Sequence, residues 1–155
     1  MIKSIEGNFD HPEVNQLLKK HFIELREASP EGSAHVLDIA GLKVPSIKFW
    51  SLWEENQLVG CGALKFLEKD HGEFKSIRIH DNFRCKGYGI KIINHLIKEA
   101  KYLNIYRISI ETGAGSFFTP ARKLFNKAGF EPCPPFAHYK EDINSLYLTK
   151  LLNNN

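Results

Sequence analysis

The sequence predicts an α/β (α+β) protein in which about seven strands form a mixed, mostly antiparallel sheet flanked by about four helices. Three observations predict this class. Stretches that alternate apolar and polar residues, as strands do, are interspersed with stretches whose apolar residues recur every three or four positions, as in helices. Short turns join three consecutive strands. A strand, a basic turn with two glycines and a helix then follow one another over residues 72–103.

The first half of the chain contains one strand, two helices and three further strands. Residues 2–6 form the first strand. Asp10, Pro12 and Glu13 are the acidic cap, early proline and early acid that mark a helix N-terminus, and Pro30 with Gly32 ends that helix. A shorter helix and three antiparallel strands follow, at 34–42, 47–53, 58–66 and 73–80.

The second half alternates helices and strands. The helix after the glycine-bearing turn presents an apolar stripe at Ile90, Ile93, Ile97, Ala100 and Leu103. The remaining elements are a strand at 106–111, a helix that Thr119 caps and Gly129 ends, a strand from Phe130 and a last strand at 145–151.

Length and composition indicate a single domain over residues 1–155 that can bury a real core. With 43% hydrophobic and 25% charged residues it reads as a soluble globular protein, and no stretch approaches the ~18 apolar residues of a membrane span. The first residues lack the apolar core of a signal peptide, and Cys61, Cys85 and Cys133 are scattered. We therefore expect a reducing, cytoplasmic location.

Charge and histidine spacing exclude other classes of function. A formal net charge of +3, spread along the chain, predicts neither a nucleic-acid nor a membrane partner. The seven histidines form no metal-binding spacing, so we expect no metal. A local basic patch for an anionic cofactor accounts for the positive charge. The chain is expected to act as a monomer or a homodimer.

The most informative motif is the basic turn Arg84-Cys-Lys-Gly-Tyr-Gly89 between a strand and a helix. Gly87 and Gly89 let the backbone approach a ligand closely, and the positive end of the helix dipole favours phosphate there. Arg84 and Lys86 add charge. A dinucleotide fingerprint needs a small residue where Ile92 stands, and the spacing of a P-loop is absent. The alternative is a basic turn that binds nothing.

Arg-x-x-Gly-x-Gly between a strand and a helix resembles the pyrophosphate signature of the GNAT superfamily of N-acetyltransferases, and the order of elements over essentially the whole chain is similar to that family's. Local matches such as Phe49-Trp-Ser-x-Trp53-Glu, Gly60-Cys-Gly-Ala-Leu-Lys65 and Pro135-Phe-Ala-x-Tyr139 resemble a bacterial subfamily labelled as indole-acetic-acid acetyltransferases. The resemblance implies the GNAT fold and acetyl-coenzyme A (acetyl-CoA) as the acetyl donor. It also implies a cofactor site made by Ile77, Arg78, Ile79, Arg84, Cys85, Lys86, Gly87, Tyr88, Gly89 and Ile90.

Acetyl transfer to an amine requires a base for the amine and a proton for the departing thiolate. Glu73 is the first candidate base, because some relatives carry a glutamate at the same offset before the phosphate loop. Glu111 at the end of the next strand is the second. For each, the alternative is a carboxylate with a structural role. In many relatives a tyrosine protonates the thiolate, but Phe125 stands at that position, which leaves Tyr139, and more distantly Tyr88, as candidate acids.

Aromatic residues are candidates for the acceptor pocket. Trp50 and Phe136 are the candidate substrate contacts, although residues on a strand alternate between faces, so Trp50 and Trp53 should point apart and at least one should be core. The leading function is acetyl-CoA-dependent N-acetyl transfer to the amine of a small molecule or peptide. The alternatives are a non-catalytic acyl-CoA-binding module with the same fold and a nucleotide-phosphate binding protein of another fold.

Overall fold

The structure is a computed structural model, and it describes residues 1–152. Its strands are β1 (Lys3–Glu6), β2 (Ile47–Glu54), β3 (Gln57–Glu68), β4 (His71–Ile79), β5 (Arg107–Gly113), β6 (Glu131–Pro132) and β7 (Ser145–Leu151). Its α-helices are α1 (Pro12–Ala28), α2 (Ile39–Leu42), α3 (Tyr88–Tyr102) and α4 (Thr119–Lys127), and two short 3₁₀ turns are η1 (Asp81–Phe83) and η2 (Ser116–Phe118). The predicted fold class is confirmed.

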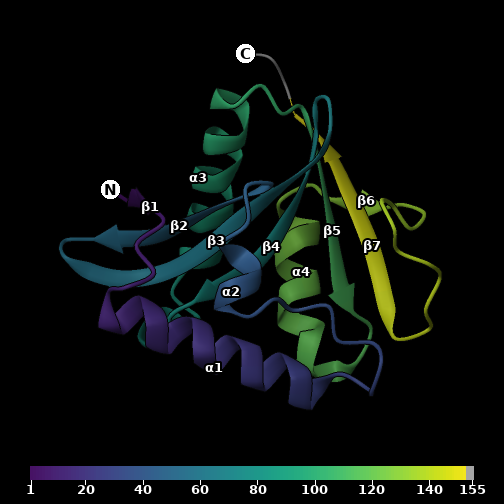
Figure 1. Cartoon of the computed structure of the whole chain (residues 1–155), viewed down its shortest axis with the longest axis horizontal. Helices are drawn as coiled ribbons and strands as arrows, with labels where there is room; N and C mark the ends of the chain where they lie inside the picture. The colour runs from purple at the N-terminus through teal and green to yellow at the C-terminus, as the bar shows by residue number, and fades with distance from the viewer. Residues whose placement is uncertain (153–155) are drawn as a thin grey trace.

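The seven strands of the described chain form one sheet in the order β1-β2-β3-β4-β5-β7-β6. Neighbouring strands are antiparallel except β4 and β5, which are parallel and are joined by the crossover helix α3. Helices α1 and α2 lie on one face of the sheet, and α3 and α4 on the other (Figure 1). Each face therefore has its own apolar cluster.

Strands β4 and β5 separate along their length, and this separation creates the functional site. They pair only where His71–Glu73 lies beside 107–109, and beyond that point they diverge (Figure 1). A bulge bends β4 here: three residue steps on β4 oppose two on β3, and Ser76 has a positive φ of 53°. A bulge leaves backbone groups unpaired and bends its strand. The sheet thus opens at its centre rather than at its edge.

The face covered by α3 and α4 holds the larger core. Its fully buried members come from β2, β3, α3 and β5, and include Leu52, Val59, Leu64, Ile92, Ile93, Leu96 and Ile108. The face covered by α1 and α2 holds a smaller cluster around Val14, Leu17, Leu42, Phe49 and Cys61. On this face, the part of the sheet near β5 and β7 carries polar side chains, such as Glu73, Lys75 and Glu111, instead of a second apolar layer.

Helix α3 buries a stripe that differs by one position from the predicted one. Gly89, Ile92, Ile93, Leu96 and Ala100 are buried, whereas Ile90 and Ile97 are only partly buried. The reason is Gly89, which lies against Leu124 of α4: a Cβ at Gly89 would come within 2.8 Å of the leucine methyl groups. Close approach of the two helices turns α3 so that the glycine faces inward.

Several predicted boundaries were wrong in detail. The predicted cap Asp10 does not cap α1; His11 does, and its Nδ1 accepts a hydrogen bond from the Glu13 N–H. The predicted helix at 34–42 shortens to α2, which Asp38 caps. Thr119 is the first residue of α4 rather than its cap, because the turn η2 leads directly into the helix. The strand from Phe130 is only two residues long.

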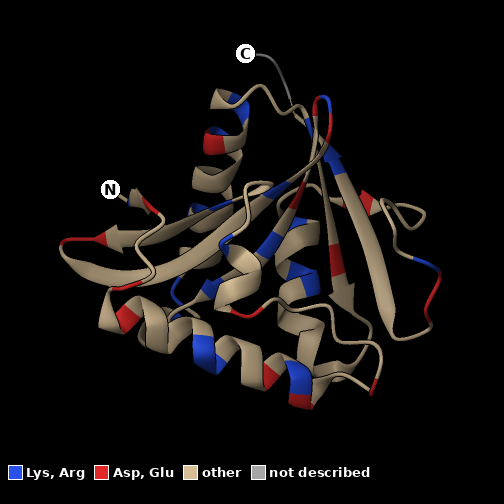
Figure 2. Ribbon diagram, viewed as in Figure 1, with Lys and Arg blue, Asp and Glu red and all other residues tan. Residues whose placement is uncertain are grey.

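Charged residues of both signs are distributed over the surface elements (Figure 2). On α1 they alternate along the outer side, whereas β4 and β5 carry charges where the two strands separate (Figure 2). None of the described helices is both long enough and apolar enough to span a lipid bilayer.

Candidate active site

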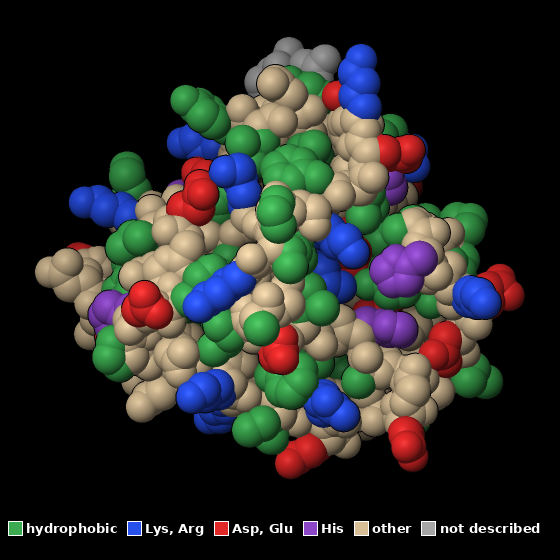
Figure 3. Space-filling model, in the orientation of Figure 1, with side chains coloured by type: hydrophobic (Ala, Val, Ile, Leu, Met, Phe, Trp, Pro, Cys, Tyr) green, Lys and Arg blue, Asp and Glu red, His purple; other side chains and the backbone are tan. Residues whose placement is uncertain are grey.

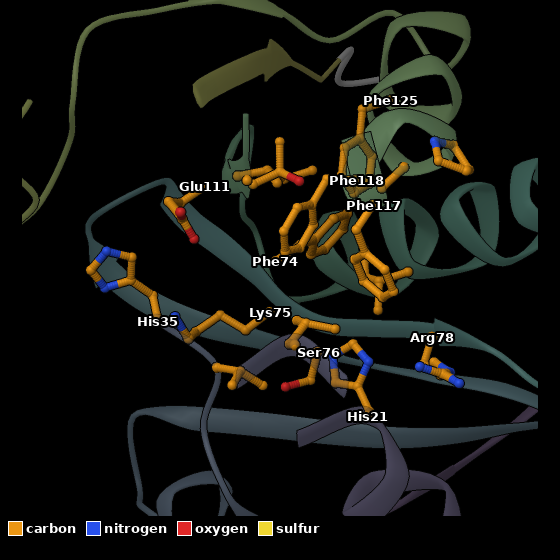
Figure 4. Close-up of a pocket in the computed structure, with 18 of the residues that line it drawn as sticks. His21, His35, Phe74, Lys75, Ser76, Arg78, Glu111, Phe117, Phe118 and Phe125 are labelled. Carbon is orange, nitrogen blue, oxygen red and sulfur yellow. The ribbon is translucent and has the colours of Figure 1, made fainter. Parts of the chain in front are cut away.

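A cavity of about 380 Å³ occupies the gap between β4 and β5. On one side it is bounded by α1 and by segment 29–36, and on the other by η2 and α4. Figure 3 shows histidine, basic and acidic side chains close together on the face that carries segment 29–36. The close-up shows aromatic residues on the α4 side and polar residues on the α1 side (Figure 4). The cavity therefore has one apolar wall and one polar wall.

The phosphate loop, residues 84–89, has the backbone conformation that an anion site requires. Cys85 and Gly87 have positive φ angles of 59° and 82°, and Gly87 precedes α3 without any side chain capping the helix. The first N–H groups of α3 have no acceptor within the helix, and the positive end of its dipole lies here. A Cβ on Gly87 would meet nothing within 4 Å, so this backbone faces open space.

Side chains of the phosphate loop contribute less than its backbone. Arg84 and Cys85 line the cavity, but the Arg84 guanidinium is half-exposed and its Nε lies 3.3 Å from Asp81. The Tyr88 hydroxyl donates a hydrogen bond to Glu54 at 2.6 Å, which raises the pKa of Tyr88 and directs its side chain away from the cavity. Tyr88 therefore offers its N–H rather than its hydroxyl. Lys86 is exposed.

Strand β4 presents different groups on its two faces. Ile77 and Ile79 pack against the α3–α4 core, whereas the Arg78 side chain crosses to the α1 side. Its guanidinium donates to Glu24 at 3.0 Å and to Asp81 at 3.3 Å. The Arg78 side chain therefore ties β4 to α1 while it also lines the cavity, and its predicted contact with the cofactor stays a prediction.

Glu73 lies at the narrow end of the cavity, at the last pair shared by β4 and β5, and its side chain is fully buried. Oε2 accepts a hydrogen bond from the Tyr139 hydroxyl at 2.7 Å and one from Lys75 Nζ at 3.3 Å. Lys75 Nζ also donates to the Tyr139 oxygen at 3.0 Å. Oε1 has no hydrogen-bond partner among the described residues. One oxygen of Glu73 is thus held by two hydrogen bonds, and the other is buried without a hydrogen-bond partner among the described residues.

Tyr139 is poorly suited to the role of acid that the sequence suggested. Burial first, and then the neighbouring Glu73 carboxylate, raise the pKa of Tyr139 far above that of a thiol. Its proton is already committed to Glu73. Its ring is fixed by edge contacts with His35 and Phe136. These observations make Tyr139 a group that orients Glu73.

Glu111 projects from β5 into the same end of the cavity (Figure 4). Its Oε2 accepts a hydrogen bond from the Ser145 hydroxyl at 2.8 Å. Burial raises the pKa of Glu111, while the Ser145 hydrogen bond and the nearby His35 and Lys75 act in the opposite direction. The two candidate carboxylates therefore lie at one end of one cavity, although 38 positions separate them in the sequence.

Unpartnered polar atoms concentrate around the cavity. Among the described residues, five buried side-chain atoms lack a hydrogen-bond partner, and four of them belong to cavity-lining residues. Those four are His21 Nδ1, Glu73 Oε1, Ser76 Oγ and Arg78 Nε. Burial and the adjacent Arg78 lower the pKa of His21 to about 4, so it is neutral at pH 7. Native proteins rarely leave buried polar groups unpaired, so water or a polar ligand is expected to pair with these atoms.

The opposite wall is aromatic. Phe74, Phe117, Phe118 and Phe125 line it from β4, η2 and α4 (Figure 4). Phe125 is buried and packs against Phe130. The residue that stands where many relatives carry a tyrosine therefore faces the cavity with no proton to donate. Among the described residues, no cluster of three or more His, Cys, Asp or Glu is placed to hold a metal ion.

The two aromatic residues predicted to contact the acceptor lie elsewhere. Trp50 is 3% exposed and belongs to the α3–α4 core, while Trp53 packs on the α1–α2 face, so the two point apart as expected. Trp50 cannot wall the acceptor pocket from that position. Phe136 lies behind Tyr139, against His71 and Tyr147, and does not line the cavity.

Sequence reasoning missed three polar residues of the site. Lys75 was not among the candidate site residues, yet its side chain is only 10% exposed and donates a hydrogen bond to Glu73. His21 and His35 come from α1 and the segment after it, and both line the cavity. The alternation on β4 indicates that Glu73 and Lys75 share a face. No local signal identifies the histidines, because the elements that bring them to β4 are distant in sequence.

Comparison with known proteins identifies the family. The family model described as the acetyltransferase (GNAT) family matches residues 12–130. This chain belongs to the GNAT family. It is 44% identical over 140 residues to the uncharacterized N-acetyltransferase YsnE of Bacillus subtilis, covering 90% of this chain and 93% of that protein. It is 40% identical to the uncharacterized N-acetyltransferase YedL of Escherichia coli, covering 94% and 91% of the two chains.

A third relative bears on the predicted subfamily. The IAA acetyltransferase of Azospirillum brasilense is 29% identical, over 90% of each chain. Solved structures agree on the fold: a Klebsiella pneumoniae protein superimposes with a TM-score of 0.77 over 99% of both chains, at 21% identity. A Bacillus subtilis acetyltransferase solved in complex with CoA gives a TM-score of 0.71 at 22% identity, covering 99% of this chain and 100% of that one. The GNAT resemblance is confirmed, and this acetyltransferase is not a phosphate-binding protein of another fold.

Proposed function

We propose that this GNAT acetyltransferase transfers the acetyl group of acetyl-CoA to the primary amine of a small molecule or peptide, with Glu73 as the base. One observation carries the proposal: a single cavity is lined by Arg84 and Cys85 of the phosphate loop and by buried Glu73, whose Oε1 has no hydrogen-bond partner among the described residues. An anion-binding helix terminus and a buried base are the two ends that an acyl-CoA-dependent transfer to an amine requires.

The residues present fit a CoA diphosphate. Gly87 supplies a left-handed backbone that faces open space, and Gly89 allows α3 to approach α4 closely enough to form the mouth of the cavity. The N–H groups that open α3, with Arg84 beside them, would hold the diphosphate. The bulged stretch of β4 from Ser76 to Arg78 does not pair with β5, so its backbone is available for the pantetheine arm.

Glu73 performs the proton step. A protonated amine that enters the narrow end meets Oε1, which takes the proton, while Oε2 keeps its hydrogen bonds from Tyr139 and Lys75. The neutral amine then has the lone pair that attack on a thioester requires. Acetyl-CoA would supply the activated acetyl group: as the new N–C bond forms, the C–S bond breaks, and the second proton of the attacking nitrogen goes to the thiolate, directly or through water, so that the thiol is released. The reaction releases one proton overall. Because Glu73 is buried, this proton would reach solvent through the polar groups that contact the carboxylate, Tyr139 and Lys75.

Acetyl transfer is tested by following thiol release from acetyl-CoA with a panel of amines, with the acetylated product confirmed by mass spectrometry. We expect amine-dependent thiol release with one product per thiol. A non-catalytic acyl-CoA-binding module would instead bind acetyl-CoA by calorimetry and release thiol at the same slow rate with and without amine. Stoichiometric binding with no amine dependence across small amines and peptides would overturn the proposal.

A further inference from the structure

The narrow end of the cavity, at Glu73 and Glu111, is where the amine would enter and is called the amine end below. It carries an unbalanced negative charge. Glu73 from β4 and Glu111 from β5 line this end, and Lys75 is the cation that acts on both, through a hydrogen bond to Glu73 and through its charge on Glu111. Two carboxylates against one ammonium leave one net negative charge when both carboxylates are ionised. Coulomb interactions are stronger in such a partly buried space than in water. One incoming ammonium group would balance the charge.

Lys75 is not free to bind a substrate anion. Its Nζ donates to Glu73 at 3.3 Å and to the Tyr139 hydroxyl at 3.0 Å, and it lies over the Tyr139 ring. The side chain is only 10% exposed, so this arrangement fixes it in place. A substrate carboxylate that recruited Lys75 would take it from Glu73 and leave a buried carboxylate without its cation, which is unfavourable.

The other basic groups that line the cavity are neutral or engaged. The Arg78 guanidinium binds Glu24 and Asp81, and Arg84 binds Asp81 near the phosphate loop. His21 is neutral at pH 7, because burial and Arg78 lower its pKa to about 4. His35 lies near Glu111 at the amine end, and its ring is held edge-on against the ring of Tyr139. A substrate anion beside the amine therefore meets carboxylates.

We propose, on the basis of the acetyl transfer proposed above, that the acceptor is an amine whose carbon bears no carboxylate. Alkylamines, arylalkylamines and amino acids with a blocked carboxyl group belong to this class, and free α-amino acids do not. The carboxylate of a free amino acid is fixed next to its amine and would face Glu73 and Glu111 whenever the amine reaches Oε1. Glu111 is the residue that rejects it, since Glu73 must contact the amine in every substrate.

Matched acceptors that differ by one carboxylate test this selectivity at pH 8. Suitable pairs are phenethylamine with phenylalanine, 3-methylbutylamine with leucine, and tyramine with tyrosine. Phenethylamine is more basic than phenylalanine, so a preference for it cannot arise from a larger neutral fraction. We expect kcat/KM for the decarboxylated member to exceed that for the amino acid by about 10-fold or more, because a like charge is excluded.

The Glu111→Gln variant assigns the selectivity to a residue. It keeps the shape of the side chain and its partner Ser145, and should raise kcat/KM for phenylalanine relative to phenethylamine by about 5-fold or more. Glu131→Gln removes the same charge from an exposed position on β6 and should leave the ratio unchanged.

Equal or greater activity with the amino acids would overturn the inference while leaving acetyl transfer intact. An unchanged ratio in Glu111→Gln would overturn the role of Glu111 and with it the electrostatic argument. Absence of turnover with all three pairs would overturn the proposed acceptor class, and thiol release with the wider amine panel would still decide the proposed function separately.

Discussion

The two ends of the cavity are built in opposite ways. The proposed phosphate end is one continuous segment, residues 84–89, in which Gly87 has a positive φ and faces open space and Gly89 packs closely against Leu124. The amine end is assembled from side chains of β4, β5, segment 29–36 and the loop before β7. Some of these side chains lie far apart in the sequence, as in the edge contact between the rings of His35 and Tyr139. A site made of backbone depends on conformation. A site made of side chains depends on a network of partners.

The largest expected effect is at the phosphate end. Gly87→Val should reduce affinity for acetyl-CoA by about 10³-fold or more, because a β-branched residue is strained at φ +82° and its side chain would occupy the open space in front of the loop. Calorimetric titration with CoA measures this loss, with thermal unfolding followed in parallel.

Gly7→Val is a matched control for strain. Gly7 has φ +83°, also has nothing within 4 Å of a built Cβ, and lies in the turn after β1. The two variants should lose similar stability, but only Gly87→Val should lose CoA binding. Unchanged CoA affinity in Gly87→Val would remove the diphosphate from this loop.

The contrast between the two ends also explains what the sequence revealed. The strand, turn and helix around 84–89 are local, so spacing alone predicted this unit of structure, and alternation placed Trp50 and Trp53 on opposite faces. Alternation places Lys75 on the same face of β4 as Glu73, but it does not show that the side chain is covered. Tyr139, which comes from the proline-rich loop before β7, contacts the Lys75 side chain. Local sequence patterns contain no information on this contact between Lys75 and Tyr139.

The same limit applies to the errors in the fold. The stripe of α3 was misplaced because Gly89 reads as a turn residue, whereas in the folded protein it is the contact point with Leu124. Phe136 was assigned to the acceptor pocket because it is aromatic, yet its ring packs against Tyr139 and does not line the cavity. Tertiary contacts decided both cases.

The second expected effect is at the amine end. Glu73→Gln keeps the oxygen that accepts hydrogen bonds from Tyr139 and Lys75 but removes the base, so kcat should fall by about 100-fold or more. The loss should be greatest at low pH, where the amine is most protonated. Acetyl-CoA affinity should remain within about twofold, since the phosphate loop is untouched.

Steady-state rates between pH 6 and 9 check this expectation. Glu68→Gln is a suitable control, because it removes an exposed carboxylate at the end of β3, next to the turn that leads into β4. Near-normal turnover of Glu73→Gln at every pH would assign Glu73 a structural role and direct attention to Glu111.

A smaller effect separates orientation from acid catalysis at Tyr139. Tyr139→Phe removes the 2.7 Å hydrogen bond to Glu73 and leaves the ring contacts, so we expect kcat to fall by about 10-fold at all pH values. A residue that protonates the thiolate would instead control the alkaline limb of the pH profile. Disappearance of that limb in Tyr139→Phe would restore Tyr139 as the acid.

The smallest expected effect concerns Phe125, where the cavity departs from many relatives of the family. A CoA thiol has a pKa near that of an ordinary thiol, about 8.5, so its thiolate leaves readily once the amine has lost its proton to Glu73. If the base is what limits the rate, an added acid gains little. We therefore expect Phe125→Tyr to change kcat by less than about threefold, even though the new hydroxyl would stand in the wall of the cavity.

Phe130→Tyr places a hydroxyl on the ring that packs against Phe125 and serves as a control for disturbance of this part of the core. A rise of about 10-fold in kcat for Phe125→Tyr alone would show that protonation of the thiolate limits the reaction. The chemistry would then be controlled from the aromatic wall rather than from the Glu73 network. A small change in Phe125→Tyr, together with the loss of activity in Tyr139→Phe, would place control of the rate at the amine end. There, removal of the amine proton depends on the side chains that hold Glu73, and the aromatic wall supplies no acid.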